Sequence, residues 1–585
     1  MLELRTRQGY QLWGAGPALR IAAVAAFLAA ACLHYRSAHF SMVRLEAIIA
    51  AEYGFVFFAS LALTAIYAGF SERLRLHRFL QSPFLIFSST ALLAAAVYKL
   101  GMHQFGGWDE GLLVHVAACY AQGFKPYVDF PCALPPLFMA GIRCAINLLG
   151  LRWTSLALTA ATFTGITALW IFALLRRAGV QRHWALVITV CVELSTMLVA
   201  PFWWYNNSSA LSVVLLILSA LACLRQPGRF FSWASLSLAL AMVLASKPND
   251  LPACLVVLAL LATRDKWQWA RTLSACAAAA AFFLLLCYAA LMPPLALLHS
   301  YVEIAKLRGS PLAMGAFREV LWPEIDFLIL FILLILVCFA VLLAIRARRQ
   351  PAHWPILAVC AIAALTSLEM LCTNAEIKTN DLSAVLVASA ILCLRPWQLE
   401  EATAPSKAVL AGLLSVFLVM AGFFSVSHLR ILGIGEYKFY EPLPTRTIQS
   451  GFFTGLDAGP RLQRVLAQSA EALARYPSQP VFFGPRMEFG YAVFHQPPLR
   501  GMPLLWDPGN LFSIERLPAL MLTFQQRDPA VLIFLKDDYT RMGPLGFYIQ
   551  HSQTYQRIDS FPDLTVYLRR PEVPIVYIHP PAPTP

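Results

Sequence analysis

Long apolar runs separated by short polar segments dominate the chain up to about residue 429. Many of these runs approach the roughly 20 residues that a helix needs to cross a bilayer. They predict a polytopic α-helical membrane protein of about 13 transmembrane helices. The predicted spans lie near residues 17–34, 48–70, 83–101, 153–174, 184–201, 208–224, 230–246, 251–263, 272–291, 326–345, 353–372, 380–395 and 407–427.

The pattern changes after the last span, so we divide the chain into a transmembrane domain, residues 1–429, and a second domain, residues 430–585. The second part begins with an amphipathic helix from Arg461 to Arg475 and carries short apolar, β-rich runs. These runs are Val481–Phe483, Val531–Phe534 and Leu564–Tyr567. They predict a small α/β domain, and the proline-rich tail from Pro571 to Pro585 predicts an extended end.

Composition and charge agree with a membrane protein. Hydrophobic residues make up 59% of the chain and charged residues 13%, outside the range of soluble domains. The net charge of +13 resides almost wholly in the transmembrane part, which favours a role in membrane orientation over nucleic-acid binding. With the N-terminus in the cytoplasm, nineteen basic residues fall in cytoplasmic segments and four in the short outer loops. We therefore expect a multi-pass protein of the inner (plasma) membrane whose α/β domain is extracytoplasmic. The first apolar run is interpreted as a signal anchor.

This orientation requires that residues 134–150 do not cross the membrane. The run is apolar, but it contains Arg143 and begins with two prolines. We predict an amphipathic helix at the outer surface, within one long outer loop from residue 102 to 152. A second long outer loop is predicted over residues 292–325.

The first outer loop carries the best candidates for chemistry. Asp109 and Glu110 are adjacent, and Asp129 adds a third carboxylate. A carboxylate held at the membrane surface beside a second acid can act as the base that accepts a proton from a hydroxyl. Asp109 also precedes an apolar helical stretch, so it is equally suited to cap that helix. The two roles are compatible.

A repeated pattern, K-x-N-D-L, supplies candidates for binding a phosphate. It includes Lys247 and Asn249 in one outer loop and Lys378 in another, each directly before an unusually short span. A lysine ammonium beside a helix N-terminus suits a phosphate, which at this depth belongs to a lipid head group. Alternatively, the Asn and Asp residues cap helices while the lysines extend to the interface.

Three further features are weaker indications of a site. Trp203 to Asn207 forms either an aromatic belt at the interface or a sugar-binding wall in which Tyr205 and Asn206 take part. His103 and Asp109 would suit a divalent metal, but their spacing matches no recognised metal site. Two loop cysteines form either a disulfide or two free thiols, namely Cys119 and Cys132.

The first outer loop resembles bacterial members of the GT-C glycosyltransferase superfamily, in the branch of protein O-mannosyltransferases and lipid A aminoarabinose transferases. The resemblance lies in Trp108–Gly111, Gly123–Phe130 and Pro135–Leu137. It implies a polyprenyl-phosphate-linked sugar as donor and an extracytoplasmic hydroxyl as acceptor. It also implies a catalytic role for Asp109, with Glu110, and a donor-phosphate role for Lys247. Tyr127 and Asp129 in the same motif become candidates for substrate binding.

The resulting hypothesis is a membrane glycosyltransferase with Asp109 as its catalytic base. The rival is a lipid or oligosaccharide transporter without chemistry, in which the same charges line a path. Transporters place charge near the midplane and show paired halves, whereas these charges are predicted at one face. A single outward-opening cavity holding both Asp109 and Lys247 would favour the enzyme.

Overall fold

The computed structural model describes residues 83–308 and 445–573 together with Phe439. Within these ranges it omits residues 104, 181, 198–200, 248–249, 263–265, 478–479, 507–511, 513, 537, 539–541 and 559–560. Six predicted spans, 17–34, 48–70, 326–345, 353–372, 380–395 and 407–427, lie outside the described residues. The predicted total of thirteen spans therefore stays a prediction.

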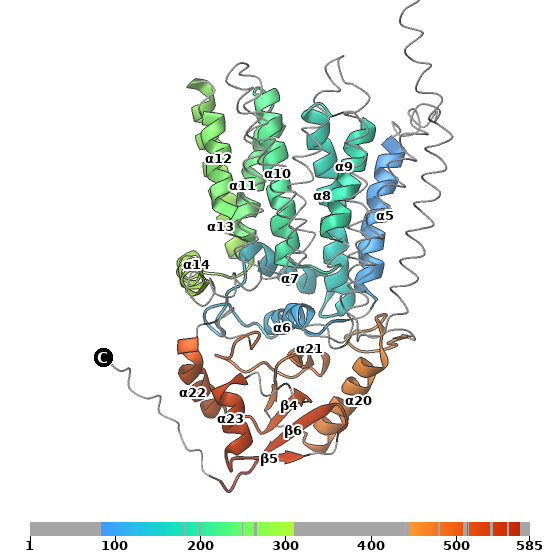
Figure 1. The fold of residues 1–585 in the computed structure, drawn as a ribbon, viewed down its shortest axis with the longest axis vertical. Helices are drawn as coiled ribbons and strands as arrows, with labels where there is room; N and C mark the ends of the chain where they lie inside the picture. Colours follow the sequence, from blue (N-terminus) through green and yellow to red (C-terminus); the bar gives the residue numbers. More distant parts are fainter. Residues whose placement is uncertain are drawn as a thin grey trace, which may run out of the picture.

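Seven helices form a bundle and correspond to the seven predicted spans between residues 83 and 291 (Figure 1). They are α5 Pro83–Gly101, α8 Trp153–Arg177, α9 Arg182–Thr196, α10 Tyr205–Arg225, α11 Phe230–Ser246, α12 Leu251–Ala262 and α13 Lys266–Ala289. Four of them, α5, α8, α10 and α13, are long and apolar enough to cross a membrane. Helix α10 is buried almost throughout because it is apolar on all sides and packs at the centre against α8, α11 and α12. The described part is therefore an α-helical membrane bundle.

Two further helices and a loop cover one end of the bundle. Helix α6, Asp109–Ala121, and helix α7, Pro136–Leu149, both belong to the segment that joins α5 to α8. The start and the end of this segment meet, because Trp153 Nε1 donates to the Gly101 carbonyl at 2.9 Å. With 14 residues, α7 is only about 21 Å long, too short to cross about 30 Å of hydrocarbon. The prediction of a helix within residues 134–150 is confirmed, and its place at the outer surface of the membrane stays a prediction.

Helix α14, Pro294–Arg308, lies across the same end and begins the second predicted outer loop. The Ser300 hydroxyl donates to the Cys132 carbonyl at 3.0 Å, which ties α14 to the first loop. Residues 309–325 of this predicted loop lie outside the described residues.

The C-terminal domain is the predicted α/β unit. A four-stranded sheet has the order β3-β4-β6-β5, and only the β3–β4 pair is parallel. Its strands are β3 Val481–Phe483, β4 Val531–Leu535, β5 Tyr555–Ile558 and β6 Leu564–Arg569. The amphipathic helix α20, Pro460–Arg475, packs on β6. The remaining elements are β1 Arg446–Thr447, β2 Asp457–Ala458, α21 Gly490–Val493, the 3₁₀ helix η6 Ile514–Arg516, α22 Leu517–Arg527 and α23 Pro544–His551. All three predicted β-rich runs are strands, and their consecutive apolar residues are buried.

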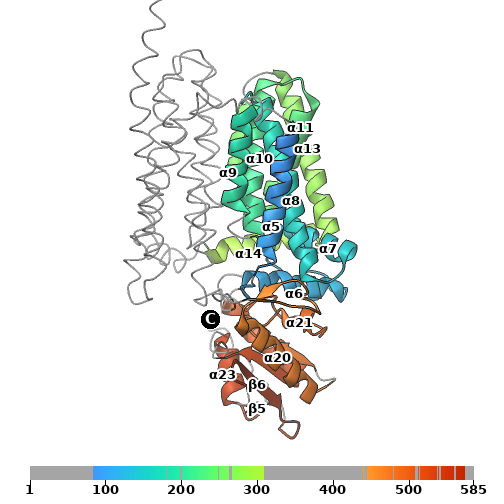
Figure 2. The ribbon, with the colours of Figure 1, turned by 90° about the vertical axis from the view of Figure 1, so that its right-hand side faces the viewer.

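The domain caps the end of the bundle that carries α6 and α7 (Figures 1 and 2). Phe105 of the first loop is fully buried in an aromatic cluster with four other rings. Ring centroids lie 5.3 Å from Trp153 of α8, 4.9 Å from Phe453, 5.2 Å from Phe489 and 6.4 Å from Phe439. Three of these contacts are edge-on and the one with Phe439 is stacked, and both geometries add to the burial of large apolar surfaces. One core therefore continues from the bundle into the C-terminal domain.

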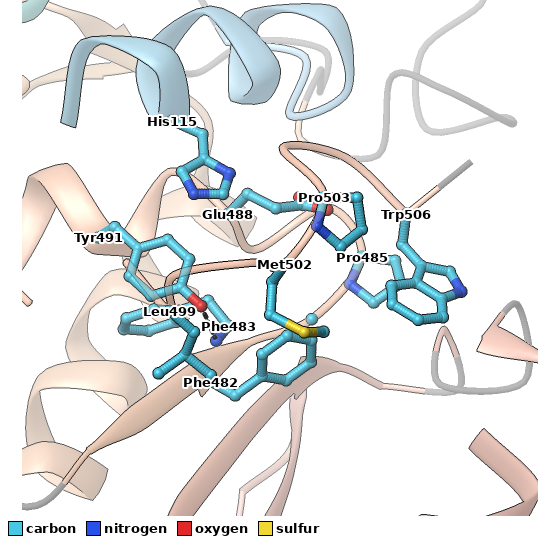
Figure 3. A pocket seen from close by; sticks show the side chains of 11 residues that line it. His115, Phe482, Phe483, Pro485, Glu488, Tyr491, Leu499, Met502, Pro503 and Trp506 are labelled. Atoms are coloured by element: carbon cyan, nitrogen blue, oxygen red, sulfur yellow. Dashed lines mark hydrogen bonds between the residues drawn. The ribbon is translucent and has the colours of Figure 1, made fainter. Parts of the chain in front are cut away.

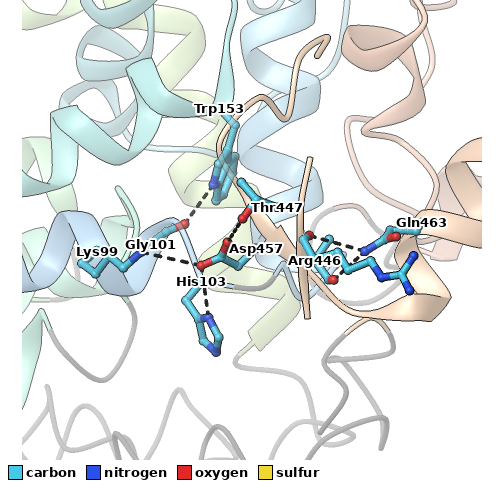
Figure 4. A network of polar contacts seen from close by, with 9 residues as sticks. Lys99, Gly101, His103, Trp153, Arg446, Thr447, Asp457 and Gln463 are labelled. Atoms are coloured by element: carbon cyan, nitrogen blue, oxygen red, sulfur yellow. Dashed lines mark hydrogen bonds and ion pairs between the residues drawn. The ribbon is translucent and has the colours of Figure 1, made fainter. Parts of the chain in front are cut away.

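A polar network lies beside this aromatic cluster (Figure 4). Asp457 in β2 accepts a hydrogen bond from the Thr447 hydroxyl at 2.6 Å and faces Lys99 of α5 at 3.6 Å. The Asp457 amide also donates to the Met102 carbonyl at 3.0 Å. The Thr447 hydroxyl, and to a lesser degree Lys99 and His103, hold the pKa of the Asp457 carboxyl below its usual value.

Candidate functional site

The acid pair opens helix α6. Asp109 and Glu110 are its first two residues, and the N-cap position belongs to Trp108, which makes no side-chain capping bond. The interpretation of Asp109 as the N-cap is therefore wrong by one position. Both carboxylates still lie in the first turn, where the helix dipole stabilises their charged form. Asp109 is partly exposed, whereas Glu110 is only 2% exposed.

The residues just before the acid pair are pressed against the C-terminal domain. Gly107 has φ +93°, and a Cβ there would lie 2.5 Å from the Phe439 ring. Only glycine fits this combination of backbone angle and close approach. The Trp108 ring lies beneath the guanidinium of Arg486, 4.9 Å from the ring centroid. Arg486 in turn pairs with Asp538 at 3.1 Å, and both side chains are buried.

The second turn of α6 contributes His115 to the same interface (Figure 3). Its Nδ1 lies 2.6 Å from the Leu504 carbonyl, and its ring stacks on Tyr491 with centroids 4.8 Å apart. The carbonyl partner requires a proton on Nδ1, and burial lowers the pKa of His115 to about 4. The imidazole is therefore neutral at pH 7.

His115 also lines a narrow pocket with room for about one water molecule. Glu488 enters this pocket from the C-terminal domain, as Figure 3 shows. Burial raises the pKa of Glu488 to about 8, so its carboxyl is mainly protonated at pH 7. Neither Asp109 nor Lys247 lines this pocket.

The motif residues Tyr127 and Asp129 form a tight turn after α6. The backbone of Tyr127 has φ +65°, and its amide donates to the Phe130 carbonyl at 2.9 Å. Burial raises the pKa of the Tyr127 phenol. The Asp129 carboxylate accepts from the Lys125 amide at 2.8 Å and faces Arg500 of the C-terminal domain at 3.5 Å. These contacts give Asp129 a structural role, while substrate binding by either residue stays a prediction.

The aromatic residues before α10 pack inside the protein. Trp203 Nε1 donates to the Phe138 carbonyl at 2.9 Å, and the Trp204 ring lies 5.4 Å from the Phe138 ring. Trp203 is 3% and Trp204 4% exposed, so neither belongs to a lipid-facing belt. They fix α7 beneath the bundle. Tyr205 is only partly buried, at the N-terminus of α10, and Asn206 beside it is 8% exposed.

The loop between α11 and α12 lies beside this helix start. Lys247 follows α11 directly and is 8% exposed. Ser209, in the second turn of α10, donates its hydroxyl hydrogen to Asp250 at 2.6 Å. Helix α12 has only 12 residues, which confirms the predicted short helix after this loop. Asn249 and Lys378 lie outside the described residues.

These positions share one end of the bundle. Tyr205 contacts Phe138 of α7 with ring centroids 6.1 Å apart, α7 packs on α6, and the Ser209–Asp250 bond holds the Lys247 loop beside α10. The opposite end carries six arginines: Arg176, Arg177, Arg182, Arg225, Arg229 and Arg271. Two of them donate to the Ala178 and Pro227 carbonyls there, from Arg225 at 2.7 Å and from Arg271 at 2.5 Å. The predicted single cavity for Asp109 and Lys247 stays a prediction.

Within the described residues, no three His, Cys, Asp or Glu side chains gather in a way that could hold a metal. His103 lies 3.8 Å from Asp457, which is a different carboxylate from the predicted Asp109 (Figure 4). Cys119 and Cys132 are buried free thiols, so the reading as two thiols is the one that the structure shows.

Sequence reasoning missed the C-terminal half of this interface. Arg486, Glu488 and Asp538 are buried charged residues, and the first two fall within the apolar stretch from Val481 to Tyr491. A charge inside an apolar stretch is a signal for a buried, paired group. Arg486 contacts Trp108, and Leu504 contacts His115, across more than 370 positions of the chain, so these contacts leave no local trace in the sequence.

Comparison with solved structures finds two crystal structures of ArnT from Cupriavidus metallidurans. The structure bound to undecaprenyl phosphate has 14% identity and a TM-score of 0.44, covering 84% of this chain and 98% of that chain. The apo structure has 14% identity and a TM-score of 0.40, covering 83% and 97%. No family model and no curated protein matches this sequence.

Proposed function

We propose that the protein is a membrane glycosyltransferase that moves a sugar from a polyprenyl-phosphate-linked donor to an extracytoplasmic acceptor, which is a glycan, a lipid or a protein hydroxyl. The observation that carries the proposal is that a partly exposed carboxylate, Asp109, and a buried ammonium, Lys247, lie at one end of a membrane bundle beneath a capping domain. Transfer from a lipid phosphate needs both a base and a cation at the membrane surface.

In this mechanism Asp109 accepts the proton of the acceptor hydroxyl. The hydroxyl oxygen then attacks the anomeric carbon, and the bond from that carbon to the phosphate oxygen breaks. The lipid phosphate keeps the electron pair and leaves beside Lys247, which stabilises its charge. Tyr205 and Asn206 would hold the sugar, and Lys378 would assist at the phosphate.

Exposure separates the two acids. Asp109 reaches the surface of the end of the bundle, whereas Glu110 is only 2% exposed and faces the protein interior. A base must reach the proton that it abstracts. Asp109 is therefore the catalytic base, and Glu110 acts beside it by tuning its charge.

The distribution of arginines supports an extracytoplasmic site. Six arginines lie at the end of the bundle away from the C-terminal domain, and basic residues concentrate on the cytoplasmic side of membrane proteins. The acid pair and the C-terminal domain would then lie on the outer side of the inner (plasma) membrane. The N-terminus would lie in the cytoplasm.

The transporter remains the second candidate, and mutagenesis separates the two. Purified protein in nanodiscs receives radiolabelled polyprenyl-phosphate sugars, and release of the polyprenyl phosphate is followed. The Asp109→Asn variant should lose at least about 10²-fold in kcat, as expected for loss of a general base. Lys247→Met should mainly lower kcat, because its ammonium stabilises the charge that develops on the leaving phosphate. The matched control is Lys125→Met, which removes an exposed lysine from the loop between α6 and α7. An Asp109→Asn protein with wild-type turnover would end the proposal.

The orientation has its own test. In a cysteine-free background, an impermeant maleimide applied to intact cells should label Gln122→Cys, an exposed position after α6. It should not label Gly228→Cys, an exposed position at the opposite end with no atom within 4 Å of an added Cβ. The reverse pattern would place the acid pair in the cytoplasm and refute the proposed site.

A further inference from the structure

Arg486 is an unusual residue in the C-terminal domain. Its side chain is fully buried, and its backbone has φ +67°, a left-handed value that non-glycine residues rarely adopt. Both features disfavour the folded state, because a buried guanidinium loses its hydration and a left-handed backbone is strained. Such features persist only where contacts with the surrounding structure compensate for their cost.

The contacts of Arg486 converge on the residues that precede the acid pair. Its guanidinium lies 4.9 Å from the centre of the Trp108 ring, and its Nε lies 3.1 Å from the Asp538 carboxylate. Its own carbonyl oxygen lies 3.7 Å from the place that a Cβ on Gly107 would occupy. The side chain of Arg486 thus contacts Trp108, and its backbone passes beside Gly107.

The Trp108 contact sets where helix α6 begins. Trp108 is the N-cap residue of α6, and Asp109 and Glu110 follow as the first two helical residues. No capping side chain fixes this helix start, since the N-cap residue forms no side-chain capping bond. A displacement of the Trp108 ring would therefore rotate or shift the carboxylates directly.

A second contact with the C-terminal domain lies about two turns further along α6, at His115. His115 is fixed between the Leu504 carbonyl and the Tyr491 ring, both from the C-terminal domain. Beyond α6, the Gly501 amide donates to the Asp129 carbonyl at 2.7 Å. The domain therefore contacts α6 at both Trp108 and His115, and the contact at Trp108 is made by the charged side chain of Arg486.

We propose that Arg486 and Asp538 are positioning residues that hold Trp108, and through it Asp109, in the geometry needed for proton transfer. This inference rests on the proposed function. It makes the C-terminal domain a part of the catalytic machinery, since the domain completes the rigid support of the base. Buried ion pairs are weak sources of stability but can specify one conformation, which is the role assigned here. A base displaced by about 1 Å can lose about 10²-fold in rate.

The test removes the pair without leaving an unpaired charge. The double variant Arg486→Met/Asp538→Leu replaces the buried ion pair by apolar side chains of similar volume, so the protein should fold and melt near the wild-type temperature. Its kcat should fall about 10²-fold, with KM for donor and acceptor within about threefold of wild type. Amide hydrogen exchange over residues 105–121 should be faster. The control is Arg464→Met/Asp563→Leu, which removes a 2.9 Å ion pair of the same domain away from α6. It should change neither kcat nor the amide exchange of residues 105–121.

Two further variants keep the proposal open to refutation. Trp108→Leu leaves the ion pair in place and should reproduce the loss of kcat, which covers the case in which the double variant does not fold. Arg486→Lys, which retains the charge, should recover part of the rate. Wild-type kcat and wild-type exchange in the double variant or in Trp108→Leu would overturn the positioning role. A wild-type protein without any transfer activity would instead refute the proposed function, while the exchange measurement would still decide whether Arg486 holds the loop.

Discussion

Replacing Gly107 by alanine tests whether the acid loop and the C-terminal domain are packed as one body. At this position φ is +93°, and the new Cβ would lie 2.5 and 2.6 Å from two carbons of the Phe439 ring. A methyl group cannot approach an aromatic carbon so closely, so either the ring or the loop must move. Phe439 is itself fully buried in the aromatic cluster around Phe105, so neither side has room.

The magnitude has two separable parts. A left-handed backbone at a residue with a Cβ costs about 1–2 kcal/mol, and overpacking of a closed core costs about 1–3 kcal/mol. We expect Gly107→Ala to lose about 2–5 kcal/mol in total. Gly123 supplies the matched control, because its φ is +75° but no atom lies within 4 Å of an added Cβ. Gly123→Ala should therefore lose only the backbone part, about 1–2 kcal/mol.

The assay is thermal unfolding of both variants in the same detergent, combined with hydrogen exchange of residues 105–121. Gly107→Ala should unfold at the lower temperature and show faster exchange in α6, since the clash separates the loop from the domain. Gly123→Ala should leave exchange in α6 unchanged. Equal unfolding temperatures for the two variants would contradict the close packing of Gly107 on Phe439, and with it the shared core.

Three further outcomes are expected. The Glu488 pKa rises from 4.5 to about 8 on folding, so the folded state keeps a proton that the unfolded chain releases, and stability is lost as pH rises from 4.5 to 8. Glu488→Gln removes this loss, so its melting temperature should exceed that of wild type at pH 8 and match it near pH 4.5. The corresponding gain in the free energy of unfolding at pH 8 is on the order of 4 kcal/mol, at about 1.4 kcal/mol per pH unit. Gly141→Ala would bring a Cβ within 2.6 Å of the Trp203 ring and should cost about 1–3 kcal/mol in thermal unfolding, because α7 must shift. Arg516→Ala removes an exposed 2.5 Å pair with Glu303 and should change stability by less than about 1 kcal/mol, so a larger loss in denaturant titration would show that this pair locks α14 to the domain.

Much of the fold follows from local sequence. All seven apolar runs between residues 83 and 291 are helices, and the three β-rich runs after residue 480 are strands. Hydropathy and periodicity act over one element at a time, so they can be read without knowing the neighbours. The exclusion of residues 134–150 from the membrane also came from sequence, because it depended on charge asymmetry summed over many loops.

The sequence also singled out the acid pair and Lys247 as candidates, since polar groups between apolar spans are costly unless they are used. It misplaced the start of α6 by one residue, because capping depends on the backbone geometry at Trp108. For Trp203 it left an aromatic belt and a sugar-binding wall open, and the burial of the ring against α7 excludes the lipid-facing belt. The partner that decides the position of Trp203, Phe138, lies 65 positions away in the chain.

Tertiary structure alone decided what supports the acid pair. Arg486 and Leu504 come within contact of α6 only when the sheet of the C-terminal domain has formed, and in that sheet β4 pairs with β3 on one side and with β6 on the other. The sequence by itself determined which segments are helices and strands and which residues carry reactive groups, because these are properties of short stretches. The support of Asp109 by a buried arginine from another domain depends on long-range packing, so only the folded chain defines it.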